Sequence, residues 1–277
     1  MRKSIIAVFI YLAVIGGNVF AQANHVCDHL FMEAVKQDLT RDILEHLRHQ
    51  WGNINYQDPI SGMTALMWVI DKGNSATLRM FLNEGKGKGQ INMNLADNNG
   101  MTTLMHAVKK GDTVIMDILM SDGALINPNT QRDGTRDTAL HYAVEQKNTD
   151  MVNCLLKNKL TQTTLVDKNG NTAFMIAVKN DNKVMVRLFG NSEGFDVTAR
   201  PIGIAFPVPP LLVAIENTLP IPMIGEILKI KNAMYSTDDD GDDAYDYLER
   251  SRYNKRQKDD IKDLLDEAKR RSSPRRN

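Results

Sequence analysis

The sequence predicts an all-α fold, a solenoid of about six to seven stacked helix-turn-helix repeats with connecting finger loops. Three observations support this fold class: a recurring apolar motif, a turn with a capping residue before it, and a second apolar stripe after it. The motif reads LMWVI, LMHAV, LHYAV and FMIAV, and its copies begin at Leu66, Leu104, Leu140 and Phe174. A spacing of roughly 34 to 38 residues is typical of a stacked array. The same register continues to Leu211 and, more weakly, to Phe31 and Tyr245.

Each unit repeats the same local elements in order. It opens with a turn, such as DNNGMT or DKNGNT, in which Gly100 or Gly170 adopts positive φ at little cost. Thr102, Thr138 or Thr172 then caps a helix of about two turns. After a polar bend, a second helix carries apolar residues at i, i+3 and i+4, as in VIMDILM, MVNCLL and VMVRLF. Neither helix can bury its stripe alone, so the copies are expected to stack.

These units resemble ankyrin repeats over about residues 27 to 267. The family pattern D-x-x-G-x-T-P-L-H-x-A-A is matched best from Asp97 to Val108 and from Asp167 to Val178. The Leu-His pair is intact at His141, which we expect to bond local backbone groups. Other copies depart from the pattern: the Pro position holds Ala65, Thr103, Ala139 and Ala173, and the His position holds Met67, Met105 and Met175. The resemblance implies protein binding through the finger tips and the inner helices.

The N-terminus has the features of a signal peptide. Arg2 and Lys3 precede the uncharged run SIIAVFIYLAVIGG, and NVFAQA offers small residues for cleavage after Ala21 or Ala23. The run is shorter than the about 20 apolar residues of a membrane-spanning helix. We therefore expect an exported protein of bacterial origin, periplasmic or secreted, with an uncleaved membrane anchor as the alternative. After cleavage we expect no stable membrane insertion.

The predicted domain organisation follows the repeat register. It comprises a signal peptide (1–23), a degenerate N-terminal capping repeat (24–57), four repeats (58–200), a fifth, Pro-rich repeat (201–236), a degenerate C-terminal capping repeat (237–271) and a basic tail (272–277). Two insertions interrupt it, NEGKGKGQINMNLADNNG and DVTARPIGIAFPVPP. Pro210, in the second, stands where the family keeps its Pro, at the start of a helix.

The sequence contains no recognisable catalytic motif. It has no Gly-rich phosphate loop, no G-x-S-x-G elbow and no H-E-x-x-H pair. We therefore expect neither enzyme activity nor a cofactor. Basic and acidic side chains balance at 34 each, which does not indicate a nucleic-acid partner, and we expect a monomer. The acidic run DDDGDD would place Ser236 and Tyr247 at ligand positions of a calcium loop, so it is interpreted as an acidic finger turn.

A histidine cluster near the N-terminus supports an alternative function, a periplasmic metal-handling accessory. Its candidate ligands are His25, Cys27, His29, His46 and His49. Their spacing matches no zinc template, and chance clustering on a polar capping repeat is the competing interpretation. The other cysteine, Cys154, is expected to be a buried apolar residue that forms no disulfide with Cys27, since the two lie about three repeats apart.

The strongest candidates for partner binding are residues that the repeat scaffold does not need. Trp68, His106 and Tyr142 directly follow the family's His position, with Ile176 and Val213 in the next two units. The resemblance places them on the inner helices, facing a concave groove. Before the capping Thr stand Met63, Met101, Asp137 and Asn171. Aromatic residues and Met are enriched in interface cores, although packing between repeats would also use them.

Overall fold

The computed structural model of the chain describes residues 19–49, 53–86, 91–121, 126–199, 201 and 208–272. Across these ranges the regular structure is fourteen α-helices and one short 3-10 helix, and the β-pairing is limited to three isolated bridges. The expected all-helical fold is confirmed. Most of the predicted signal peptide lies outside the described residues. None of the described helices is long and apolar enough to span a membrane.

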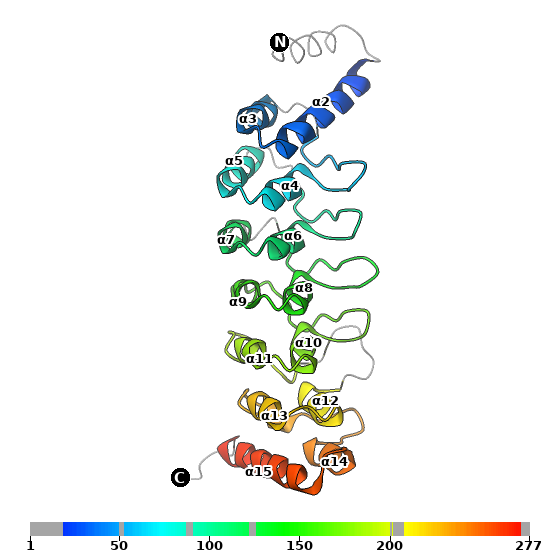
Figure 1. The fold of residues 1–277 in the computed structure, drawn as a ribbon, viewed down its shortest axis with the longest axis vertical. Helices are drawn as coiled ribbons and strands as arrows, with labels where there is room; N and C mark the ends of the chain where they lie inside the picture. The colour runs from blue at the N-terminus through cyan, green and yellow to red at the C-terminus, as the bar shows by residue number, and fades with distance from the viewer. Residues whose placement is uncertain are drawn as a thin grey trace. The chain divides into compact units, whose positions relative to one another are not determined.

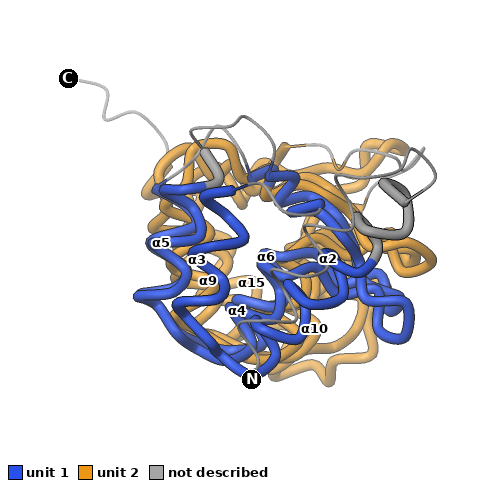
Figure 2. The backbone as a smooth tube through the Cα atoms, turned by 90° about the horizontal axis from the view of Figure 1, so that it is seen from above, with its two compact units in different colours: residues 1–127 blue, residues 128–277 orange. Residues whose placement is uncertain are grey.

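The chain divides into two compact units, Met1–Asn127 and Pro128–Asn277, which Figure 2 distinguishes by colour. The described helices of both units come in antiparallel pairs. We call the first helix of each pair the inner helix and the second the outer helix. In Figure 1 the loops between pairs extend from the side of the inner helices; we call these loops fingers.

In unit 1, each helix packs against its pair-mate and against the equivalent helix of the next pair. The three pairs described there are α2 (Val19–Lys36) with α3 (Thr40–His49), α4 (Ala65–Lys72) with α5 (Ser75–Lys86), and α6 (Thr103–Lys110) with α7 (Thr113–Ser121). Helix α2 includes both predicted cleavage positions. Helix α5 continues to Lys86, so the first insertion begins later than the sequence suggested; residues 87–90 lie outside the described part.

Unit 2 repeats the same packing in its own four described pairs. They are α8 (Ala139–Glu145) with α9 (Thr149–Lys157), α10 (Ala173–Lys179) with α11 (Lys183–Gly190), α12 (Pro210–Glu216) with α13 (Ile221–Ile227), and α14 (Ala244–Arg250) with α15 (Lys255–Ser272). A 3-10 helix, η1 (Ala233–Tyr235), lies between α13 and α14. Residues 200 and 202–207 of the Pro-rich insertion are outside the described part.

The capping residues determine where the inner helices begin. The side chains of Thr64, Thr102, Thr138 and Thr172 each accept a hydrogen bond from the third residue after the cap. Such a cap satisfies one of the free N–H groups at a helix start. Pro210 is the first residue of α12, as expected. At α14 the cap is Asp243, which the family pattern does not contain.

Five of the described fingers close with a backbone hydrogen bond to the residue before the cap. Before α4, α6, α10 and α14 its donor is an aspartate, with N···O distances from 2.9 to 3.1 Å: Asp58, Asp97, Asp167 and Asp238. Before α8 the donor is Arg132, at 2.8 Å from the carbonyl of Asp137. Gly100 and Gly170 have φ of +72° and +77°, so the predicted left-handed turns are confirmed. The α8 finger therefore closes with the same backbone hydrogen bond as the others, but an arginine stands in place of the aspartate.

The core lies between the helix layers. Leu104, Leu140 and Leu155 are fully buried, which confirms the register of both apolar stripes. Cys154 is only half-buried, in contrast to the expectation, because its place on α9 is at the edge of the stripe. Both cysteines are free thiols.

Candidate functional site

The predicted binding residues occupy fixed positions counted from the residue that caps each inner helix. Position −1 holds Met63, Met101, Asp137, Asn171 and, before α14, Asp242. Position +4 holds Trp68, His106, Tyr142, Ile176, Val213 and, in α14, Tyr247. Position +7, one turn further, holds Asp71, Lys109, Glu145, Lys179, Glu216 and Arg250. Position +7 faces the same side of the helix as position +4 because residues three apart are neighbours.

In unit 1 the residues at these positions mostly make contacts within the chain. Met63 and Met101 are buried, and Trp68 is half-buried. The Lys36 ammonium lies 5.5 Å from the centre of the Trp68 ring, close enough for a cation–π contact. The same ammonium is 3.2 Å from a carboxylate oxygen of Asp58. The aromatic ring and the finger aspartate therefore hold one cation between them.

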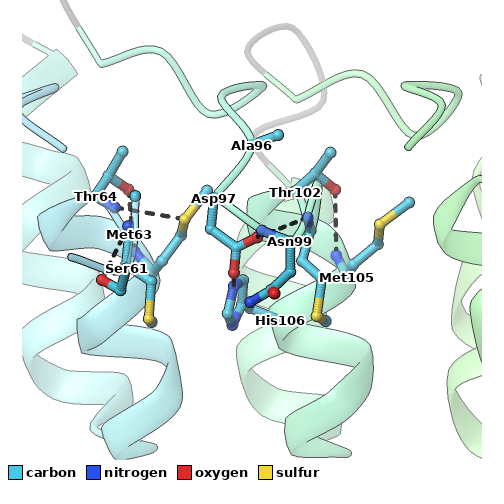
Figure 3. Close-up of polar contacts among 12 residues, drawn as sticks. Ser61, Met63, Thr64, Ala96, Asp97, Asn99, Thr102, Met105 and His106 are labelled. Atoms are coloured by element: carbon cyan, nitrogen blue, oxygen red, sulfur yellow. Dashed lines mark hydrogen bonds and ion pairs between the residues drawn. The ribbon is translucent and has the colours of Figure 1, made fainter. Parts of the chain in front are cut away.

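His106 is bound to the finger turn rather than exposed. Figure 3 shows the Asp97 side chain reaching from the finger onto the His106 ring of α6. His106 Nε2 lies 3.1 Å from Asp97 Oδ2, and Asp97 Oδ1 accepts the N–H groups of Asn99 and Met101 at 2.8 and 2.9 Å. Because a carboxylate only accepts, Nε2–H of His106 is the donor. His106 Nδ1 and Trp68 Nε1 are sealed from solvent without a hydrogen-bond partner.

In unit 2, His141 confirms the structural role expected for it. Its Nδ1 lies 3.3 Å from the backbone N–H of Thr138 and 2.8 Å from that residue's hydroxyl. Its Nε2 lies 3.1 Å from the backbone carbonyl of Asn171 in the next finger. Burial lowers the pKa of His141, although nearby backbone and acidic groups oppose the shift. The residue joins one helix cap to the following finger.

Asn171 is also occupied within its own repeat. Its side-chain amide donates to Asp167 at 3.3 Å, and its side-chain oxygen accepts from Lys179 at position +7. The same −1 and +7 pairing recurs at α14, where Arg250 forms an ion pair with Asp242. The Arg250 guanidinium also lies 5.3 Å from the centre of the Tyr247 ring at position +4.

At α8 the equivalent positions carry acids. Asp137 is buried at position −1, Tyr142 is half-buried at position +4, and Glu145 is exposed at position +7. Burial, and then the carboxylates of Asp137 and Asp167, raise the pKa of Glu145, while Arg132 lowers it.

Comparison with known proteins identifies the family. A family model of ankyrin repeats in three copies matches residues 31–131 and 124–200, which is more than half of the chain. The chain belongs to the ankyrin-repeat family. The crystal structure of the ankyrin repeat domain of Bcl-3, a unique member of the IkappaB protein family, is similar to it with a TM-score of 0.65. That match has 16% sequence identity and covers 84% of this chain and 97% of the Bcl-3 domain, so it shows the fold alone.

No significant match is found among curated proteins. Ankyrin repeats generally mediate protein–protein interaction and are typically non-enzymatic, so a protein partner is the general expectation. The predicted binding residues differ in how accessible they are. Trp68, Tyr142 and Asn171 are half-buried, whereas Met63, Met101, His106 and Asp137 are buried. Their assignment to partner binding stays a prediction.

The repeat register identifies four further candidate residues that the sequence motifs did not indicate. Asp242, Tyr247 and Arg250 belong to the repeat of α14, which lacks the family's Leu-His motif, and Glu145 lies one turn beyond the predicted position on α8. Counting from the capping residue would have found them, since Asp243 caps α14 as Thr138 caps α8. The acidic run before α14 is a finger turn, as expected: Asp238 accepts from the N–H groups of Asp240 and Asp242 at 3.0 and 2.9 Å.

Several residues of the proposed metal cluster make other contacts in the structure. His46 is buried, stacks on Phe31 with ring centres 5.6 Å apart, and bonds the backbone carbonyl of Asp42 at 2.8 Å. His49 lies 3.3 Å from Glu45, and His29 is exposed. The side chain of His25 lies outside the described residues. Among the residues that are described, no group of three or more His, Cys, Asp or Glu is placed to hold a metal ion.

Proposed function

We propose that this ankyrin-repeat protein is an exported, non-enzymatic scaffold that binds a partner protein through its inner helices and fingers. One observation carries the binding proposal: position +4 presents a large aromatic side chain that the core does not enclose. Leu140 is fully buried, yet Tyr142, two residues further on the same short helix, is half-buried. Aromatic residues in such settings are frequent binding hot spots.

Site-specific photo-crosslinking tests the binding surface. A benzophenone amino acid is placed at position 68 or 142, and in control chains at position 114 or 184 on the outer helices. Val114 and Val184 are suitable controls because they are 49% and 55% exposed. The proposal expects a partner protein to be captured from positions 68 and 142 in the native compartment. Capture from the outer-helix positions alone would contradict it.

Export is proposed on the basis of the N-terminal sequence and is tested separately. Mass spectrometry of the native protein should find its first residue at Gln22 or Asn24. Either cleavage removes the start of α2 and leaves the segment from Cys27 to Lys36, which contains the buried Phe31, Met32 and Val35. An intact Met1 in a membrane fraction would instead support the uncleaved anchor. The binding proposal does not depend on which result is obtained.

A further inference from the structure

A cavity of about 680 Å³ lies where the inner helices α12 and α14 end. Helix α12 packs directly against α14, and both belong to unit 2. The lining includes Glu216 at the end of α12, Tyr247 and Arg250 in α14, and Ser251 and Arg252 directly after it. Ligand-binding clefts typically measure about 300–1,000 Å³. The cavity therefore has room for side chains of another molecule.

Several polar groups of the lining are already engaged within the chain. The Tyr247 hydroxyl donates to Asp238 at 2.9 Å, and the Ser251 hydroxyl donates to the carbonyl of Leu248 at 2.6 Å. Arg250 is held by its ion pair with the residue at position −1, and its guanidinium lies 5.3 Å from the centre of the Tyr247 ring. A ligand would have to break an existing contact to use any of these groups fully.

Two charged residues of the lining are not engaged in this way. Glu216 is exposed at position +7 of α12, and Arg252 is exposed two residues after Arg250. Within the part of the chain that the structure describes, neither side chain forms a hydrogen bond or an ion pair, and the two do not pair with each other. One cavity is thus lined by an acid and a base that both remain available to a ligand.

The charge of Glu216 acts on the aromatic ring of this cavity. Burial, the hydrogen bond to Asp238, and then the carboxylates of Asp238 and Glu216 raise the pKa of Tyr247 to about 12, while Arg250 lowers it. Glu216 therefore lies near the ring at position +4, although it belongs to the preceding repeat. Acid and ring together favour a cation at this end of the cavity.

The two available charges suit a ligand that carries both signs. The planar guanidinium of Arg252 can donate two parallel hydrogen bonds to one carboxylate. The Glu216 carboxylate accepts from an ammonium or a guanidinium group. A ligand with a single charge would pair with one of these residues and meet a like charge on the other. Charge complementarity therefore selects a ligand with an acid and a base close together.

We propose that this cavity binds an acidic and a basic side chain of the partner protein, the acid on Arg252 and the base on Glu216. The inference rests on the proposed scaffold function and specifies the charges that the partner presents to α12 and α14. It also extends the binding surface from the aromatic residues at position +4 to the ends of these two inner helices.

A peptide titration of the full chain tests the contact. The probe is acetyl-Gly-Lys-Gly-Glu-Gly-amide, and two control peptides replace either its Glu by Gln or its Lys by norleucine. Binding is followed by the NMR shifts of the backbone amides of Glu216 and Arg252. We expect the probe to shift both resonances and each control peptide to bind about fivefold more weakly.

Charge exchange separates recognition from a folding defect. Arg252→Glu and Glu216→Lys should each weaken probe binding about tenfold, because each places a like charge against the peptide. The double variant exchanges the two charges and should bind the probe as the wild type does. The surface control Asp263→Asn should not change binding. Thermal midpoints should stay within the same range, since both side chains are exposed.

Other results would overturn the proposal. They are equal binding of the probe and both controls, no binding by the wild-type chain, and weak binding by the double variant. Glycine that binds as tightly as the probe would assign the cavity to free amino acids instead. If position 142 captures the partner in Arg252→Glu as efficiently as in the wild type, this contact is refuted and the scaffold function stands. Failure of capture in the wild type would refute the scaffold itself.

Discussion

Two glutamates of unit 2 meet opposite surroundings. Glu226, on the outer helix α13, is buried and receives two hydrogen bonds from Arg187 of α11, both 2.7 Å, and one from Lys229 at 2.8 Å. These bonds lower the pKa of Glu226 to about 2. Glu145, at the end of the inner helix α8, is more exposed. Partial burial, and then the carboxylates of Asp137 and Asp167, raise its pKa, while Arg132 lowers it.

The difference shows which charges the chain compensates by itself. On the outer helices the carboxylate is fully paired, and the pair also joins one repeat to the next. On the inner helices, a basic side chain at position +7 contacts the residue at position −1 at α10 and at α14. Helix α8 differs, because acids occupy both of these positions.

The largest expected effect is the difference in unfolding free energy between a core variant and a variant of the inner-helix face at α8. Leu140→Ala should lower the free energy of unfolding by about 2–5 kcal/mol, because the fully buried side chain leaves a cavity. Tyr142→Ala, two residues away, should cost much less. Urea unfolding followed by circular dichroism measures both. Similar losses for the two variants would show that Tyr142 is a packing residue and remove it from the binding surface.

A medium effect on stability is expected when Glu226 loses its arginine partner. Arg187→Met removes two charge-assisted hydrogen bonds from Glu226 and should cost about 1–3 kcal/mol at pH 7. The folded-state pKa of about 2 lies below the ordinary value of 4.5, so ionised Glu226 stabilises the protein above pH 4.5. That contribution is lost as the pH falls from 4.5 towards 2. The wild-type and variant stabilities should therefore converge at low pH; a constant difference would contradict the pairing.

Much of this architecture could be predicted from the sequence, because its causes are local. The capping threonines, the glycines at positive φ and the apolar stripes leave their pattern within each repeat, and the structure confirms them. The pairing of charges could not be predicted in the same way. Arg187 and Glu226 lie on different repeats, and nothing in their spacing indicates that they meet. Asp137 was predicted as a site residue, whereas Glu145 was not, because its position matters only when it is compared with Arg250 at the equivalent position.

The smallest expected effect concerns Glu145 itself. Because its pKa is raised on folding, the native state binds more protons than the unfolded state between the two pKa values. Wild-type stability therefore falls as the pH rises through that range. Glu145→Gln should remove this loss and stabilise the protein by about 0.5 kcal/mol at pH 7, the scale of an exposed charge interaction. The gain should vanish below the ordinary glutamate pKa, and a destabilised variant at pH 7 would contradict the account.

The most direct test of the interaction between Asp137 and Glu145 is the titration of Glu145 by carboxyl-detected NMR in the wild-type chain and in Asp137→Asn. The substitution keeps the shape of residue 137 and removes its charge. The account predicts a pKa for Glu145 above the ordinary glutamate value of 4.5 in the wild type and a lower pKa in the variant. The same pKa in both proteins would mean that the Asp137 carboxylate does not act on Glu145, which would contradict the account.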